Sequence, residues 1–488
     1  MSLGGLKSDE SLADVVKRED LSFDDVYNDK LRTYGGRFLA AYIEAKGLTE
    51  EQYGTVVKDI QEGLRWEKKE YDFLGSCESG EKVQWMRLAL GVFGELKETD
   101  SLDVLVLVSQ YLNSKVPWSN DELAQMAQKF QKEYGQAGSR FLERIKPSLL
   151  SIPNVKVSSS GYKRAGSKAA GLRPSLGFSG VASGIFEDDK RKEWKHSENI
   201  TALSTVCGFL AVPDDSAEFQ ANWPVAITFI LNVLDDSDPL FRAQGCYLVE
   251  NALESGHSPV LMKSGHVDLF LESTETCLNY LPNLTPANVS LCVLGAAYPL
   301  LYKLKALRKD PVSSYIEVLE KNVLGSISHV QGRNSDRGTN EVLSFLLSQA
   351  CSLIANHLGA AVLGCFSRLN YTLCQTITNP FLIDADGGAE VVDMALNVHD
   401  KCLTAFIAVE DKEGRELFAS HKYDLLAAWI VLLKRVMKFK AGTTNTKDRL
   451  LRNVKGLSEI VGVDEIKEDY QAALESNPES LPSWDQII

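Results

Sequence analysis

Apolar residues recur at spacings of three and four along most of the chain, and alternating, strand-like patterns are scarce. This spacing gathers apolar side chains on one face of a helix. It predicts helices that include residues 124–145, 201–212, 225–234, 241–253, 291–307, 342–358 and 425–439. Short stretches with Pro, Gly, Asp or Asn separate these segments. Roughly fifteen helices joined by such turns predict antiparallel helix pairs stacked side by side.

The clearest repeat unit spans residues 223–254. We expect Pro224 in the first turn of an apolar helix that ends at an Asp-rich turn. Asp238 is placed to cap the next helix, and Pro239 takes its first position, where a missing N–H costs nothing. Arg242 follows just inside that helix. This layout is typical of a HEAT unit, although an ordinary helical hairpin is the alternative. We therefore expect an all-α, HEAT/armadillo-like helical-repeat solenoid, an α-α superhelix.

One region breaks the helical pattern. Residues 154–192 are rich in Ser, Gly and basic side chains and have no helical period, which indicates a flexible linker. Their dispersed basic residues favour a solvated linker over a nucleic-acid patch. The predicted organisation is a flexible N-terminus, an N-terminal helical block, this linker, a C-terminal helical array and a polar tail. These parts span residues 1–20, 21–153, 154–192, 193–475 and 476–488, respectively.

Composition narrows the class of protein. The formal net charge of −14 over 488 residues argues against a nucleic-acid binder, which usually has a basic surplus. Nine scattered cysteines without a CxxC pair indicate a reducing compartment, so we expect the cytoplasm and nucleus. The first residues lack the layout of a signal peptide. The longest apolar stretch, residues 425–433, is shorter than the roughly 20 residues of a membrane span, so no membrane partner is expected.

Candidate chemistry is sparse in the sequence. No phosphate-binding loop, dinucleotide fingerprint, nucleophile elbow or HExxH helix is present. Residues 384–388 resemble the start of a calcium loop, but the glycine comes two places early, so a polar loop is favoured. The aspartates of residues 235–238 are better explained as helix caps than as metal ligands. His399 and Cys402 lie one helical turn apart without a second ligand pair, which favours core packing. We expect no enzyme activity, cofactor or metal.

Trp194 lies inside a charged segment directly after the predicted linker. A tryptophan in this position either pins the segment to the core or contacts a partner. Pinning is the favoured interpretation, because tryptophan is usually well buried.

A series of residues follows in a fixed order across roughly a hundred positions, and the order is more specific than any one helix or turn signal. The series comprises Trp194, Lys195, Trp223, Pro224, Asp235, Asp236, Pro239, Arg242, Gly245, Gly265, Leu281, Pro282 and Tyr298. With Arg191 and residues 173–178 before it, this series resembles the Tel-two-interacting-protein-two family. The chain departs at Ser264, where the family more often has Thr. The N-terminal block matches only as helical and divergent.

The resemblance implies a function that the composition does not. Family members are helical-repeat subunits of the TTT complex that bind its scaffold subunit, Tti-one. With the Tel-two protein they act as a co-chaperone that links phosphatidylinositol-three-kinase-related kinases to the Hsp-ninety machinery. In fungi they are also found with the ASTRA assembly. The expected role is a non-catalytic adaptor whose series residues are structural or partner-binding, with apolar helix faces exposed in the isolated chain.

Two alternatives remain open at this point. One is a stand-alone HEAT protein of transport or phosphatase-regulatory type, which should repeat Trp/Asn or acidic positions at fixed offsets. No such recurrence is visible. The other is a degenerate helical enzyme, which the missing carboxylate and histidine clusters disfavour.

Overall fold

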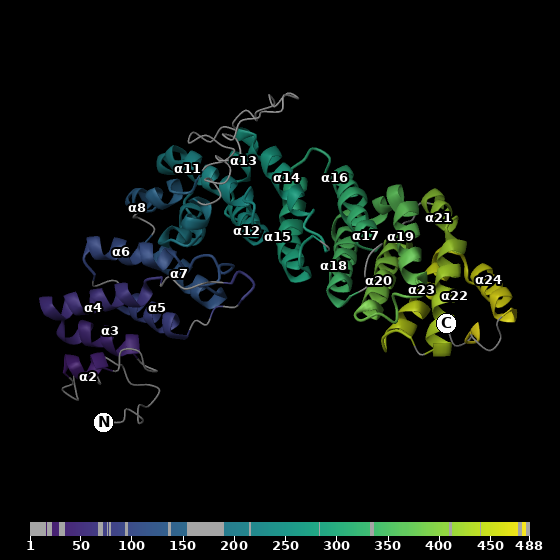
Figure 1. The fold of residues 1–488 in the computed structure, drawn as a ribbon, viewed down its shortest axis with the longest axis horizontal. Coiled ribbons are helices and arrows are strands. Elements are labelled where there is room, and N and C mark those ends of the chain that lie inside the picture. Colours follow the sequence, from purple (N-terminus) through teal and green to yellow (C-terminus); the bar gives the residue numbers. More distant parts are fainter. Residues whose placement is uncertain are drawn as a thin grey trace, which may run out of the picture. The chain divides into compact units, whose positions relative to one another are not determined.

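The structure is a computed structural model that contains helices and turns and, among the residues it describes, no strand (Figure 1). The all-α prediction is confirmed. The described residues are 16, 22–28, 35–66, 72–75, 77, 80–92, 96–134, 138–153, 190–213, 216–282, 284–331, 336–408, 412–439, 441–476 and 481–484. The chain divides into two compact units, Met1–Gly265 and His266–Ile488.

The first unit holds short helices joined by tight turns. Its elements are α2 (Phe23–Asn28), α3 (Gly35–Lys46), α4 (Glu50–Leu64), α5 (Gly80–Val92), α6 (Glu98–Ser109), α7 (Asp121–Tyr134), α8 (Gly138–Leu150), the 3₁₀ turn η3 (Glu198–Thr201), α10 (Ala202–Leu210), α11 (Ala217–Leu234), α12 (Pro239–Glu254) and α13 (Ser258–Ser264). A further helical stretch covers residues 190–195. Each helix packs mainly on elements one to three places away in this order.

Residues 124–145, predicted as one helix, belong to two. The first, α7, ends at Tyr134, and α8 begins at Gly138. Residues 135–137 between them lie outside the described residues.

Helices on both sides of the predicted linker share one core. Helix α8 packs on α10 and α11, and α6 packs on α10. Polar contacts join them too: Ser204 Oγ donates to the Ser109 carbonyl at 3.1 Å, and Asn113 Nδ2 donates to the Leu203 carbonyl at 3.1 Å. The compact units therefore divide after Gly265 and not within residues 154–192. Of that predicted linker, residues 154–189 lie outside the described residues, and residues 190–192 are helical.

The second unit continues the helical pattern. Its elements are α14 (His266–Cys277), α15 (Ala287–Ala306), α16 (Pro311–Glu317), η4 (Val318–Leu324), α17 (Gly325–Gln331), α18 (Arg337–Leu353), η5 (Ile354–Leu358), η6 (Gly359–Cys365), α19 (Phe366–Thr378), α20 (Gly388–Ile407), α21 (Lys412–Ala419), α22 (Lys422–Phe439), α23 (Thr446–Val461) and α24 (Val463–Glu475). Helix α15 packs on α18, α18 on α20, and α20 on α23.

The predicted helix at residues 342–358 is α-helical only as far as Leu353. It continues as the π-helical turn η5, and Gly359 then reverses the chain with a φ of 50°. That backbone conformation is open to glycine and strained for other residues. By length and composition alone, α15 and residues 337–378 are also apolar enough to cross a membrane. Each, however, has about half of its apolar window buried inside the helical unit.

The range predicted as a polar tail contains a packed anchor. Leu481 and Trp484 are each 7 % exposed. The Trp484 ring lies 5.6 Å from that of Tyr470 on α24, and the Tyr470 hydroxyl donates to the Pro482 carbonyl at 3.0 Å. Leu481 and Trp484 therefore pack this segment against α24. The polar composition of residues 476–488 did not predict this contact.

Candidate functional site

At the start of α12, the Asp-rich turn between α11 and α12 has the structure that its sequence predicts. The Asp238 carboxylate accepts the Leu240 N–H at 3.0 Å, and Pro239 takes the first helical position. The α11 end differs from the prediction. Pro224 lies inside α11, because the helix already begins at Ala217 behind the cap that Ser216 provides.

Asp236 is the centre of a buried ionic cluster that we define as Arg191, Lys195, Asp236, Asp238 and Arg242. Asp236 is 1 % exposed, and its carboxylate lies 2.9 Å from Arg191 Nη1 and 2.7 Å from Lys195 Nζ. The Asp238 N–H donates to the same carboxylate at 2.9 Å, and Arg242 Nε donates to the Asp236 carbonyl. Capping therefore explains Asp238, whereas Asp236 is an ion-pair acceptor that the sequence pattern did not distinguish from it.

Trp194 pins its segment to the core, as favoured from the sequence. It is 5 % exposed, and its indole N–H donates to Ser151 Oγ at 2.7 Å. Its ring centroid lies 6.0 Å from that of Phe229 and 5.9 Å from that of Phe241, and Lys195 Nζ lies 4.4 Å from the Phe241 centroid. The helical stretch at residues 190–195 is thereby fixed by one indole and two cations. No motif in the sequence marks Ser151 as the partner.

The two glycines of the series have different structural reasons. A Cβ added at Gly245 would lie 2.4 Å from the Leu234 Cα, so glycine is what lets α12 approach α11 closely. Gly265 ends α13 with a φ of 72°, a left-handed conformation that glycine adopts without strain.

Trp223 and Asp235 complete the first unit's part of the series. Trp223 is buried. Its ring stacks on that of Phe219 with the centroids 5.1 Å apart, and its centroid lies 5.8 Å from that of the tilted His257 ring. Asp235 forms the C-terminal cap residue of α11. Trp223 therefore serves the packing of α11 against its neighbours, whereas Asp235 ends α11 through its backbone N–H.

Leu281, Pro282 and Tyr298 lie in the second unit. Leu281 and Pro282 are buried in the turn before α15, and Tyr298 is fully buried within α15. The Tyr298 ring lies 6.0 Å from that of Phe345 on α18, and burial raises the pKa of its phenol. Only part of the series therefore lies near the α11–α12 turn. Leu281, Pro282 and Tyr298 pack in the core of the second unit.

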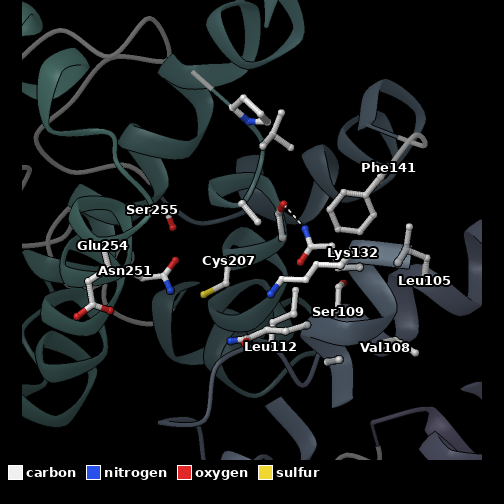
Figure 2. A pocket seen from close by; sticks show the side chains of 17 residues that line it. Leu105, Val108, Ser109, Leu112, Lys132, Phe141, Cys207, Asn251, Glu254 and Ser255 are labelled. Carbon is white, nitrogen blue, oxygen red and sulfur yellow. Dashed lines mark hydrogen bonds between the residues drawn. The ribbon is translucent and has the colours of Figure 1, made fainter. Parts of the chain in front are cut away.

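The first unit also contains a cavity of about 640 Å³ between α6, α7, α8, α10 and α12 (Figure 2). Leu105, Val108, Leu112 and Phe141 line its apolar side. Figure 2 shows Asn251, Glu254 and Ser255 of the α12 end on one side of Cys207 and Lys132 of α7 on the other. This volume falls within the range of small-molecule sites, roughly 300–1,000 Å³.

Several polar side chains that line this cavity have structural roles or are uncharged. Gln131 Nε2 donates to the Gly208 carbonyl at 2.6 Å, which ties α7 to α10. Burial raises the pKa of the Cys207 thiol to about 12, so the thiol stays protonated at neutral pH. The Asn251 Oδ1 is buried without a hydrogen-bond donor among the described residues. A protonated thiol is a poor nucleophile, so nothing in the lining supports covalent chemistry.

The other candidates from the sequence are structural. Asn370 Oδ1 lies 3.2 Å from His399 Nε2, and the Trp429 N–H donates to His399 Nδ1 at 3.1 Å. Burial lowers the pKa of His399 to about 3. Cys402 is buried beside it. Among the described residues no group of three or more metal-ligating side chains occurs. Residues 384–387 form the turn before α20, and Gly388 is the first residue of that helix.

Several large apolar side chains are exposed on the second unit. The exposed set comprises Leu284, Val312, Tyr371, Phe381, Leu417, Tyr423, Val431, Met437, Phe439 and Val463. Phe381, directly after α19, is 82 % exposed. Exposed aromatic side chains of this size are typical of protein contact sites.

Comparison with known families decides the affiliation. A family model described as the Tti2 family matches residues 104–384, which is more than half of the chain. The chain belongs to the Tti2 family. The match contains every residue of the series, so the predicted resemblance is confirmed, and membership in the Tti2 family implies a role related to the TTT complex. No curated protein matched the chain.

Proposed function

We propose that the chain is a non-catalytic adaptor subunit of the TTT complex. It binds the scaffold subunit Tti-one directly, and through it the Tel-two protein and phosphatidylinositol-three-kinase-related kinases. Its activity is to support Hsp-ninety-dependent folding, stability and assembly of those kinases, in the cytoplasm and nucleus, without nucleic-acid or membrane partners. The observation that carries this proposal is the Tti2 family match over residues 104–384.

The packing order within each unit supports a helical-repeat adaptor. Each helix contacts mainly elements close to it in the chain, and this is typical of HEAT-like solenoids, which present long surfaces without needing a pocket. The protonation states of Cys207 and His399 are compatible with a binding role as well. The Cys207 thiol and the His399 imidazole are buried and uncharged at neutral pH, as their pKa values of about 12 and about 3 require.

Phe381 is the side chain that we assign to the Tti-one contact. It is the most exposed aromatic residue among the described residues of the region that matches the family, at 82 % exposure, and its backbone N–H donates to Asn379 Oδ1 at 3.0 Å. An exposed aromatic side chain that becomes buried on binding can anchor a protein interface.

The test is co-expression with Tti-one, followed by affinity capture and cross-linking mass spectrometry. The wild-type chain should give a stoichiometric complex with cross-links between residues 194 and 384. Phe381→Ser should lower capture at least ten-fold. Tyr423→Ser is the matched control, because Tyr423 is 62 % exposed but lies outside the family match. Both variants alter exposed rings, so neither should change the folded state.

Either of two results would count against the proposal. A monodisperse wild-type chain that ignores Tti-one would remove the adaptor role and leave a stand-alone HEAT-like binder. Normal capture of Phe381→Ser, with cross-links only outside residues 104–384, would keep the complex and move the interface elsewhere.

A further inference from the structure

The junction of α22 and α23 concentrates positive charge in an acidic protein. Residues 434–455 contain eight basic residues and one acidic residue, whereas the whole chain has a formal net charge of −14. Helices α22 and α23 pack together and are joined by residues 440–445, so the last turns of α22 lie beside the first turns of α23. We call the described cations there the α22–α23 basic face: Lys434, Arg435, Lys438, Lys447, Arg449, Arg452 and Lys455.

These cations differ from others in the same unit because none of the seven forms an ion pair with a described carboxylate. Lys422, at the opposite end of α22, lies 2.5 Å from Glu465 and 2.8 Å from Asp469. Lys305 lies 3.0 Å from Glu275. The unit therefore pairs some of its other cations, whereas those of the basic face form no ion pair with a described carboxylate.

Asp393 of the packed helix α20 bonds to the connection between α22 and α23. Asp393 accepts the Thr446 hydroxyl at 2.5 Å and the Thr443 hydroxyl as well. These bonds clamp the α22–α23 connection onto α20. The connection between the two helices that carry the cations is therefore fixed to the rest of the unit.

Two arginines of the basic face are incompletely bonded. Arg435 Nη1 and Arg449 Nε are buried and have no hydrogen-bond acceptor among the described residues. A buried N–H without an acceptor is unfavourable. An anion at this face that draws either guanidinium outward would relieve that penalty and gain a charge-assisted hydrogen bond.

Apolar side chains accompany the cations. Val431, Met437 and Phe439 are 37 %, 42 % and 69 % exposed, and Lys438 Nζ lies 5.3 Å from the Phe439 ring centroid. Exposed apolar groups between cations suit a polypeptide better than a phosphate backbone.

We propose that the α22–α23 basic face binds an acidic polypeptide segment that carries at least one aromatic or large aliphatic side chain. Carboxylates of the segment pair with the cations, and its apolar side chain packs on Phe439 and Met437. This face lies beyond residues 104–384, so it is a second contact, separate from the one assigned to Tti-one.

The probe is a fluorescent twelve-residue peptide of Glu and Asp with one Phe and one Leu, measured by anisotropy against the full chain. The test variant is Lys438→Glu/Arg452→Glu, in which both side chains are exposed. Its matched control is Lys309→Glu/Arg368→Glu, because this pair has the same charge change at exposed positions away from the face. We expect the test variant to weaken peptide binding at least ten-fold and the control by less than two-fold. Phe439→Ser should weaken it three- to ten-fold.

Three results would overturn the proposal. The first is no saturable peptide binding by the wild-type chain. The second is equal weakening by the two charge-reversal pairs, which would reduce the effect to net charge. The third is tighter binding of a twelve-nucleotide single strand than of the peptide, lost in the test variant, which would make the face a nucleic-acid site. Phe381→Ser should bind the peptide normally, so failure here is distinguishable from failure of the Tti-one assignment.

Discussion

The α11–α12 turn and the α22–α23 basic face each gather several charges where two consecutive helices meet, but they satisfy them differently. At the turn, Asp236 is 1 % exposed and holds Arg191 and Lys195 within 3 Å. At the basic face, Lys438 and Arg452 are exposed and form no ion pair with a described carboxylate. In both regions the charged side chains lie at the junction of two consecutive helices, so the two regions differ in how those side chains are paired.

This difference separates structural charge from charge available to a partner. A buried ion pair is costly to break, because removal of one partner leaves the other charge desolvated. Exposed cations contribute little to folding but set the rate and specificity of association. Residues of the family series such as Asp236 are therefore expected to act on stability, whereas cations that no motif marks are expected to act on binding.

The largest expected effect is that of Asp236→Ala. Removing this carboxylate leaves Arg191 and Lys195 without their shared buried acceptor. We expect a loss of about 3–5 kcal/mol in the free energy of unfolding, measured by urea denaturation. Asp268→Ala is the control, because Asp268 is 72 % exposed in its pair with Arg308 and should cost at most about 1 kcal/mol. Similar losses in the two variants would contradict the contrast between paired burial and exposure.

The next largest effect tests the helix contact that closes the turn. In Gly245→Ala the new Cβ would lie 2.4 Å from the Leu234 Cα, so α11 and α12 must separate and stretch the ionic cluster. We expect a loss of about 3 kcal/mol. Gly295→Ala in α15 is matched, since nothing lies within 4 Å of its new Cβ, and it should gain up to about 1 kcal/mol. A neutral Gly245→Ala in thermal and urea unfolding would show that the close contact is not required.

Much of this fold was predictable because its local signals agree with each other. The helical period, the Asp238 cap and Pro239 at the start of α12 all acted locally, and the structure places them as expected. The prediction for Pro224 was wrong. A proline usually lies in the first turn of a helix, but Ser216 caps α11 well before Pro224, so this proline lies inside the helix. The division into units also failed to follow composition, because α8 buries its apolar face against helices that lie beyond residues 154–189.

The candidate sites were predictable to a smaller degree. Order and spacing marked Trp194, Lys195 and Asp236, but Ser151 and Pro153, which bind Trp194 and Arg191, carry no pattern and lie about 40 residues away. The basic face escaped notice for a different reason. Its cations are spread over two helices, and only the turn between α22 and α23 brings them together.

A smaller effect concerns a polar group that is buried without charge. His399 has its pKa lowered by burial from 6.5 to about 3, so the unfolded chain binds a proton below pH 6.5 that the native chain does not. Stability from this group is complete above pH 6.5 and falls as the pH drops towards 3. The expected loss is about 1.4 kcal/mol per pH unit, or about 2 kcal/mol at pH 5.

The measurement is urea denaturation of the wild-type chain and of His399→Gln between pH 7 and pH 5. The variant should lose this part of the pH dependence, although it is less stable overall because Trp429 and Asn370 lose the imidazole. In the wild-type chain, the ring resonances of His399 should not shift over this range. A native titration near pH 6 would show that the imidazole accepts a proton in place, contrary to its two hydrogen bonds.

The smallest expected effect on stability is that of Lys438→Glu/Arg452→Glu. Both side chains are exposed and lack a described carboxylate, so their replacement breaks no ion pair and lowers repulsion among the seven cations. The free energy of unfolding should change by less than about 0.5 kcal/mol, while peptide binding falls at least ten-fold. Raising the salt concentration from 0.05 to 0.5 M should weaken peptide binding by the wild-type chain, because screening acts on exposed charges. It should leave the Asp236→Ala stability loss nearly unchanged, because that pairing is buried. If the charge-reversal variant instead unfolded as readily as Asp236→Ala, the cations of the basic face would be structural, and the distinction between the two regions would fail.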